Sequence, residues 1–75
     1  MSAPVSPWTP CKVKFYSGRK GFGFLYREGA RDIFIHAYTL DKAKFPGSLH
    51  PEEPVEVQFQ DGPRGLHAIN IRVPQ

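Results

Sequence analysis

Hydrophobic and polar side chains alternate with a period of two along five short segments of the chain: residues 11–16, 22–26, 32–38, 55–59 and 66–73. Successive side chains of a β-strand point to opposite faces, so this period is typical of strands, and no segment sustains the 3.6-residue period of a helix. Clusters of Gly, Pro and charged residues separate the segments, as in turns. Five short strands predict an all-β fold, and a small closed barrel leaves few strand edges unpaired.

Two stretches lack this alternation. Residues 1–10 contain three prolines and the single Trp, which predicts a flexible Pro-rich arm in front of a domain of residues 11–75. Residues 39–54 contain three prolines, a Gly and scattered charges, which predicts a long connection with at most a helical turn near residues 40–45. A chain of 75 residues suffices for one small domain.

The direction in which each strand side chain points predicts the core. In residues 22–26 and 32–38, the aromatic rings and the imidazole fall on one face and the aliphatic side chains on the other. A small barrel is too narrow for so many rings, so we expect the aliphatic side chains inside, with those of residues 55–59: Leu25, Ile33, Ile35, Val55, Val57 and Phe59. Antiparallel pairing of the two ring-bearing strands then forms one exposed patch: Phe22, Phe24, Phe34 and His36.

Positive charge is concentrated in the part of the chain that carries these rings. Residues 1–44 hold eight Lys/Arg and three Asp/Glu, a net +5, whereas residues 45–75 hold two and four, a net −2. Rings interleaved with cations suit single-stranded nucleic acid, in which each base offers a face for stacking and each linkage a phosphate. Duplex DNA fits less well because no recognition helix is predicted. Two alternatives stay open: a solvated basic face without a partner, and a helix or loop that covers the rings.

Other classes of protein find little support in the sequence. One Cys excludes an internal disulfide, and the three His and the Cys lack the spacing of metal ligands, so we expect no metal and no cofactor. Gly21 and Gly23 lack the third Gly of a dinucleotide fingerprint, and no carboxylate is placed to orient His36 as a general base, so we expect no enzyme. No apolar run approaches the about 20 residues of a membrane span, and no signal peptide is visible, which predicts a cytoplasmic protein.

Two motifs in a fixed order resemble those of a known family. The run VKFYSGRKGFGFL, followed by DIFIH, is similar to the RNP1-like and RNP2-like strands of cold-shock domains, and the resemblance covers about residues 12–73, including DGPRGLHAINI. An RRM also carries the motif KGFGF, but its two motifs occur in the opposite order and it needs two helices. The resemblance implies a five-stranded antiparallel OB-type barrel that binds single-stranded RNA and DNA, with a preference for pyrimidine-rich stretches.

The resemblance also implies roles for individual residues. Base stacking is implied for Phe15, Phe22, Phe24, Phe34, His36 and Phe45, and contacts to phosphates or base edges for Lys14, Lys20, Asp32 and Arg64. Strict alternation would instead place Phe15 inside with Val13. Ala37 poses a similar conflict, because alternation puts it on the aliphatic side and the resemblance puts it at an exposed stacking position.

The sequence departs from the family pattern at several points. Phe15 stands where the family usually has Trp, Ala37 stands where bacterial members usually have an aromatic residue, and the loop of residues 42–54 is longer than usual. The implied function is that of an RNA chaperone or a regulator of transcription or translation. The alternative is a protein-interaction module of the same fold, which docks a transcription or ribosome-associated partner through the aromatic face.

Overall fold

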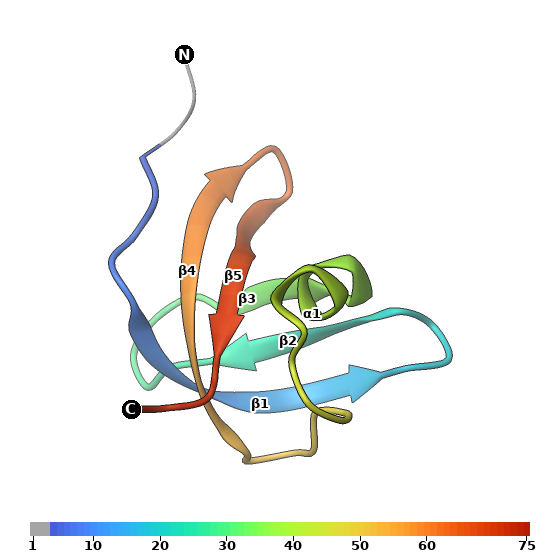
Figure 1. Cartoon of the computed structure of the whole chain (residues 1–75). Helices are drawn as coiled ribbons and strands as arrows, with labels where there is room; N and C mark the ends of the chain where they lie inside the picture. Colours follow the sequence, from blue (N-terminus) through green and yellow to red (C-terminus); the bar gives the residue numbers. More distant parts are fainter. Residues whose placement is uncertain (1–3) are drawn as a thin grey trace.

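The computed structural model describes residues 4–75, which form five strands and one short helix (Figure 1). In chain order these are β1 (Thr9–Ser17), β2 (Phe22–Tyr26), β3 (Ile33–His36), α1 (Ala37–Ala43), β4 (Pro54–Gly62) and β5 (Gly65–Arg72). The strands close into a barrel in the order β1-β2-β3-β5-β4. The prediction of an all-β, OB-type barrel of five strands is therefore confirmed.

One strand pairing differs from the all-antiparallel arrangement that the sequence analysis expected. β3 and β5 pair in parallel, with Ile33 opposite Leu66, while the other neighbouring strands are antiparallel. The reason is geometric, because strand direction cannot alternate at every contact in a closed ring with an odd number of strands. The connection through α1 and β4 supplies the chain length that a parallel pair requires.

The barrel interior is filled by aliphatic side chains, as the alternation predicted. The largest completely buried side chains come from β1, β2, β3 and β4: Val13, Leu25, Ile33, Ile35, Val55 and Val57. Phe59 packs against this core but stays half-buried. Burial of each such aliphatic side chain stabilises the fold by about 1.5–3 kcal/mol, so these few residues account for much of the folding free energy of so small a domain.

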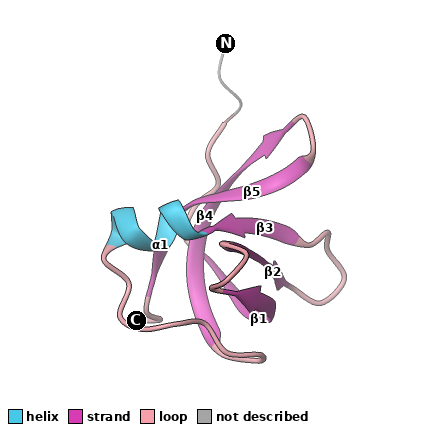
Figure 2. Cartoon of the chain, turned by 90° about the vertical axis from the view of Figure 1, so that its right-hand side faces the viewer, coloured by secondary structure: helices cyan, strands magenta, loops and turns pink. Residues whose placement is uncertain are grey.

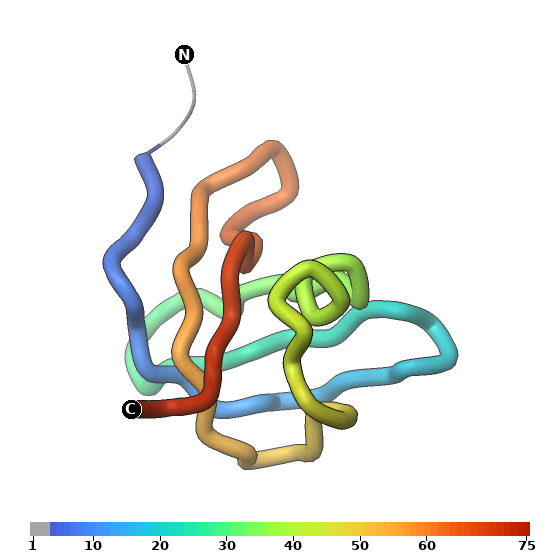
Figure 3. Tube along the Cα trace, in the orientation of Figure 1, coloured from blue at the N-terminus to red at the C-terminus, as the bar shows by residue number. Residues whose placement is uncertain are grey.

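Part of the segment predicted as a flexible Pro-rich arm contacts the barrel. β1 begins at Thr9, inside that segment, and residues 5–8 run beside β4 (Figure 3). The backbone N–H of Ser6 donates to the carbonyl of Phe59 at 2.8 Å, and the Ser6 hydroxyl accepts from the N–H of Phe59 at 2.9 Å. The guanidinium carbon of Arg72 lies 4.1 Å from the centre of the Trp8 ring. Residues 1–3 lie outside the described residues.

The third predicted strand ends earlier than expected and continues as a helix. β3 ends at His36, and α1 starts at Ala37 (Figure 2). The imidazole of His36 caps the helix, because its Nδ1 accepts the backbone N–H of Tyr38 at 3.0 Å. Thr39, which is buried, donates its hydroxyl to the carbonyl of Ala68 at 3.2 Å and so ties α1 to β5. Ala37 is therefore a half-buried helix residue, and neither of the two expectations for it describes its position.

Irregularities in β1 and β5 change which side chains face outward. The pairing of β1 with β2 shifts between Val13, opposite Leu25, and Phe15, opposite Phe24, so that Lys14 is the extra residue of a β-bulge. Val13 is buried, yet Phe15, two positions later, is exposed. In β5 the register shift falls at Ile69, which is half-buried on the outside. Phe15 thus has the surface position that the resemblance implied, strict alternation was wrong about it, and its stacking role stays a prediction.

The β1 bulge brings two backbones close together at a glycine. A Cβ added to Gly23 would clash with the carbonyl oxygen of Phe15 and would lie 2.7 Å from the Cα of Tyr16. These are backbone atoms, so relief of the contact would have to separate β1 from β2. Gly23 is therefore required by close packing of the two strands.

We expect Gly23→Ala to destabilise the fold by about 1–3 kcal/mol or more, because the added methyl group overpacks the β1–β2 contact. Urea unfolding measures this loss. The matched control is Gly18→Ala, whose Cβ would meet only the Tyr16 ring, at 3.9 Å. Equal unfolding midpoints for the two variants would contradict this account of Gly23.

Candidate nucleic-acid interface

Five aromatic side chains form a continuous group on the outer face of β1, β2 and β3. We call this group the ring cluster: Phe15, Phe22, Phe24, Phe34 and His36. Strand register brings it together, since Phe24 pairs with Phe34 and Phe22 with His36 across β2 and β3. The bulge in β1 adds Phe15 at the edge.

The geometry within the ring cluster keeps the side chains together without burying them. Phe22 and Phe34 are stacked, with their centroids 5.7 Å apart and an interplanar angle of 19°. Phe24 meets Phe34 edge to face at 5.7 Å, and Phe15 meets Phe22 in the same way at 6.1 Å. None of the five members is buried, and Phe15 is 41% exposed. The rings are thus a surface feature, which disfavours the alternative of a second covered core.

Two of the predicted polar contact residues pair with each other beside the ring cluster. The ammonium of Lys14 lies 2.8 Å from a carboxylate oxygen of Asp32. Both side chains are well exposed, 58% and 39% respectively, and such surface ion pairs contribute only about 0–1 kcal/mol. Because the pair is weak, Lys14 can leave Asp32 and contact a ligand with little loss of free energy.

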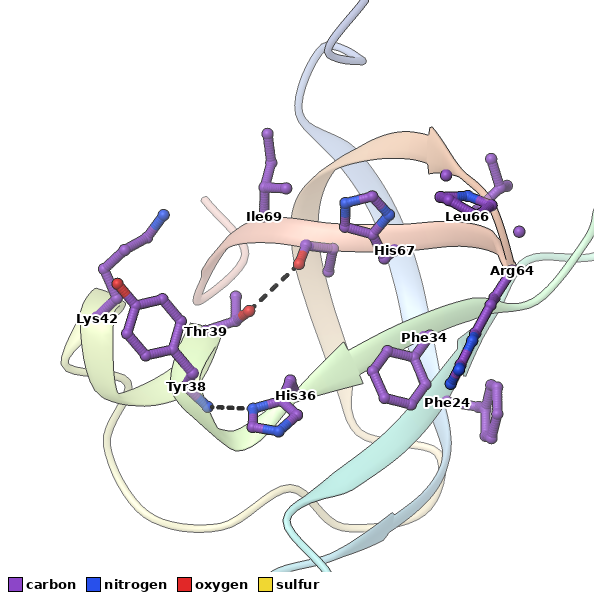
Figure 4. Close-up of a pocket in the computed structure, with 14 residues that line it drawn as sticks. Phe24, Phe34, His36, Tyr38, Thr39, Lys42, Arg64, Leu66, His67 and Ile69 are labelled. Carbon is purple, nitrogen blue, oxygen red and sulfur yellow. Dashed lines mark hydrogen bonds between the residues drawn. The ribbon is translucent and has the colours of Figure 1, made fainter. Parts of the chain in front are cut away.

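The other predicted polar residues lie in two turns that border the same face. Lys20 is exposed in the turn between β1 and β2, where its backbone N–H donates to the Ser17 hydroxyl at 3.1 Å. Arg64 lies in the turn between β4 and β5, and it lines a groove together with Phe24 and Phe34 (Figure 4). Both cations are thus placed at the margin of the ring cluster.

Phe45 is the predicted stacking residue that the structure does not bring to the ring cluster. It is half-buried against the core after α1, and its backbone N–H donates to the carbonyl of Leu40 at 3.0 Å. Together with Tyr16 it lines a separate small hollow of about 220 Å³. Any contact of Phe45 with a ligand would therefore occur on a second surface.

The groove beside the ring cluster contains residues that the sequence analysis did not single out as contacts. It has a volume of about 720 Å³ and runs between α1 and the β4–β5 hairpin, with Tyr38, Lys42 and His67 in its lining (Figure 4). These residues were missed because Tyr38 was assigned to a strand and Lys42 to an irregular loop. His36 caps the helix but is not one of the residues usually found at an N-cap, so the sequence offers no clear local signal for α1.

Several ionisable groups of the barrel have raised pKa values. Burial raises the pKa of the Cys11 thiol, which keeps it protonated at neutral pH. The hydrogen bond that the Tyr26 hydroxyl donates to Glu52 raises the pKa of Tyr26. Residues 4–75 contain no group of His, Cys, Asp and Glu side chains able to hold a metal ion, and no helix in that range is long and apolar enough to cross a membrane.

Comparison with known proteins agrees with this geometry. The sequence model of the family described as the 'Cold-shock' DNA-binding domain matches residues 10–74. The chain belongs to the cold-shock domain family. Its members bind nucleic acids, and the exposed ring cluster suits that activity.

Several bacterial proteins are similar to this cold-shock domain over most of their length. The cold shock-like protein CspD of Bacillus cereus is 38% identical over 60 residues, which cover 80% of this chain and 89% of that protein. The cold shock protein CspA of Staphylococcus saprophyticus is 36% identical over 59 residues, 79% and 88% of the two chains. The cold shock-like protein CspJ of Salmonella typhimurium is 33% identical over 60 residues, 79% and 84%.

Neighbouring residues on opposite faces of β3 allow binding to be separated from folding. We expect Phe34→Ala to weaken binding to a short oligonucleotide by about 1–3 kcal/mol, because it removes one base–ring stack. Ile35→Val should lower the free energy of unfolding by about 0.5–1.5 kcal/mol and leave the affinity of the folded protein unchanged. Titration and urea unfolding of both variants test this. The assignment of the two faces is wrong if Ile35→Val weakens binding while Phe34→Ala does not.

Proposed function

We propose that this protein binds single-stranded RNA and DNA by stacking bases on the ring cluster, with nearby cations contacting the phosphates. The observation that carries the proposal is a group of five aromatic side chains that contact one another while none is buried. Exposed apolar surface of this kind is usually an interaction site. Base stacking on aromatic side chains is worth about 1–3 kcal/mol per base, so a few rings suffice for useful affinity.

Single strands are the better ligand for such a surface. The bases of a duplex are stacked inside it and cannot reach a flat group of rings, whereas the bases of a single strand can. The one helix of residues 4–75, α1, has seven residues and is tied to β5, so it is poorly suited to enter a major groove. Both features favour flexible RNA or DNA over duplex.

The hydrogen bond of His36 supports a preference for bases that carry carbonyl groups. Its Nδ1 accepts the backbone N–H of Tyr38, so the proton of the neutral ring lies on Nε2. That N–H is free to donate to a base oxygen, and uracil and thymine each offer two. This supports the pyrimidine-rich ligands implied by the resemblance, though guanine also carries one such oxygen.

The biological role that we propose follows from the weak sequence specificity of base stacking. Stacking is tolerant of base identity, and a protein that holds many RNAs single-stranded acts as an RNA chaperone, which is the role we favour over regulation of individual transcripts. The chaperone role requires no catalytic step. We also propose a cytoplasmic location. The competing hypothesis is a protein partner on the same rings; Lys14, Lys20 and Arg64 around them favour a polyanion.

Titration with labelled oligonucleotides tests this function. We expect seven-nucleotide oligo-dT and oligo-U to bind and a duplex of mixed sequence to bind far more weakly. With about three or four phosphates neutralised, log K should fall with log salt with a slope of about −2 to −3, since each contact to a single strand contributes about −0.7.

The control is Lys20→Gln, which should make that slope less negative by about 0.7 because one phosphate contact is lost. Equal affinity for the duplex, or no binding of either single strand, would refute the proposed function. A slope beyond about −5 would indicate diffuse binding to the basic part of the chain, and the rings would not be the site.

A further inference from the structure

The groove between α1 and the β4–β5 hairpin begins at the ring cluster. Phe34 and His36 belong both to the ring cluster and to the groove lining, so the two surfaces are continuous (Figure 4). Backbone and aliphatic side chains of β5 contribute to the lining, among them Ile69, which lies on the outer face between buried Ala68 and the register shift. The groove volume of about 720 Å³ lies within the range of small-molecule sites.

Tyr38 presents an exposed ring on a fixed backbone at this groove. Its side chain is 66% exposed, the highest value among the large hydrophobic residues described. Its backbone is held on one side by the hydrogen bond to His36, and the next residue, Thr39, is buried and bonded to Ala68. The ring is thus presented without the entropic cost of ordering a loop, which makes it a suitable stacking platform.

The charge of the groove favours an anionic occupant. Its lining contains Lys42 and Arg64 and no Asp or Glu. The other hollow next to α1, which contains Phe45, has the carboxylate of Asp41 in its lining and is less suited to a phosphate. An occupant that offers a flat ring to Tyr38 and a negative charge to Lys42 has the chemistry of a nucleotide.

We infer that a strand bound to the ring cluster continues past His36 into this groove, where one further base stacks on Tyr38 and its phosphate contacts Lys42. The inference rests on the proposed function and extends it by one nucleotide subsite formed by α1 and β5. The subsite is used only by strands long enough to reach beyond the ring cluster. Its contribution must therefore depend on oligonucleotide length.

A length series of oligo-dT, from four to nine nucleotides, tests this dependence. For the longest oligomers we expect Tyr38→Ala to weaken binding by about 5- to 100-fold, whereas Tyr38→Phe keeps the wild-type affinity because its ring still stacks. For the shortest oligomers all three proteins should bind alike. Thermal unfolding of each variant checks that the fold is intact, which we expect because the Tyr38 side chain is exposed.

The phosphate contact has a separate readout. Lys42→Gln should make the salt slope less negative by about 0.7 for long oligomers and leave it unchanged for short ones. The matched control is Lys44→Gln, which removes the same charge from an exposed position that does not line the groove. The slope of this control should equal that of the wild type at every length.

Three results would overturn the inference. If Tyr38→Ala binds all lengths like the wild type while Phe34→Ala is impaired, the groove is not a subsite, although the proposed function stands. If Tyr38→Ala weakens short and long oligomers equally, the Tyr38 ring does not form a separate subsite for the longer strands. If the wild-type protein binds no oligomer, the proposed function and the inference fail together.

Discussion

Packing of aliphatic side chains inside a narrow five-stranded barrel determines where the aromatic rings lie. Leu25, Ile33 and Ile35 are completely buried in the interior. The alternation of each strand then directs the neighbouring rings outward. Register across β2 and β3 aligns those outward rings into a single group. The core and the binding surface are thus the two faces of the same strands.

Two irregularities extend this surface beyond what simple alternation provides. The bulge at Lys14 turns Phe15 outward to join the ring cluster, and Gly23 allows the backbones to approach closely there. The shift at Ile69 returns Ile71 to the core, while Ile69 itself lines the groove beside α1. His36 links the two regions, because its ring lies in the cluster while its Nδ1 caps the helix that carries Tyr38. Orientation of the imidazole and placement of the helix therefore depend on each other.

The parts of the fold that sequence reasoning could predict are those controlled by local periodicity. Leu25, Phe34 and Ile35 follow the period of two and lie where it puts them. Phe15 does not, because a bulge adds one residue to β1, and the sequence of β1 alone does not indicate the bulge. The parallel contact of β3 with β5 follows from closure of the ring and not from any single segment.

Long-range contacts explain the remaining differences. The helix α1 is short, and tertiary contacts such as Thr39 to Ala68 stabilise it, so its own sequence carries a weak signal. The Pro-rich segment before β1 was predicted as a flexible arm. Its hydrogen bonds are made to Phe59, far along the chain, so local sequence does not indicate them. The exposed patch predicted from alternation and strand pairing is present, and the binding roles of its residues stay predictions, whereas the groove depends on where α1 meets β5.

The most direct test of this account is to follow individual side chains by NMR while unlabelled oligo-dT is added. The account predicts large shifts of the aromatic resonances of Phe22, Phe24 and Phe34, because stacked bases exert ring-current effects on them. The methyl resonances of Leu25, Ile33 and Ile35 should move little, since these groups are buried behind the strands. Large methyl shifts with unchanged aromatic resonances would contradict the assignment of the rings as the binding surface.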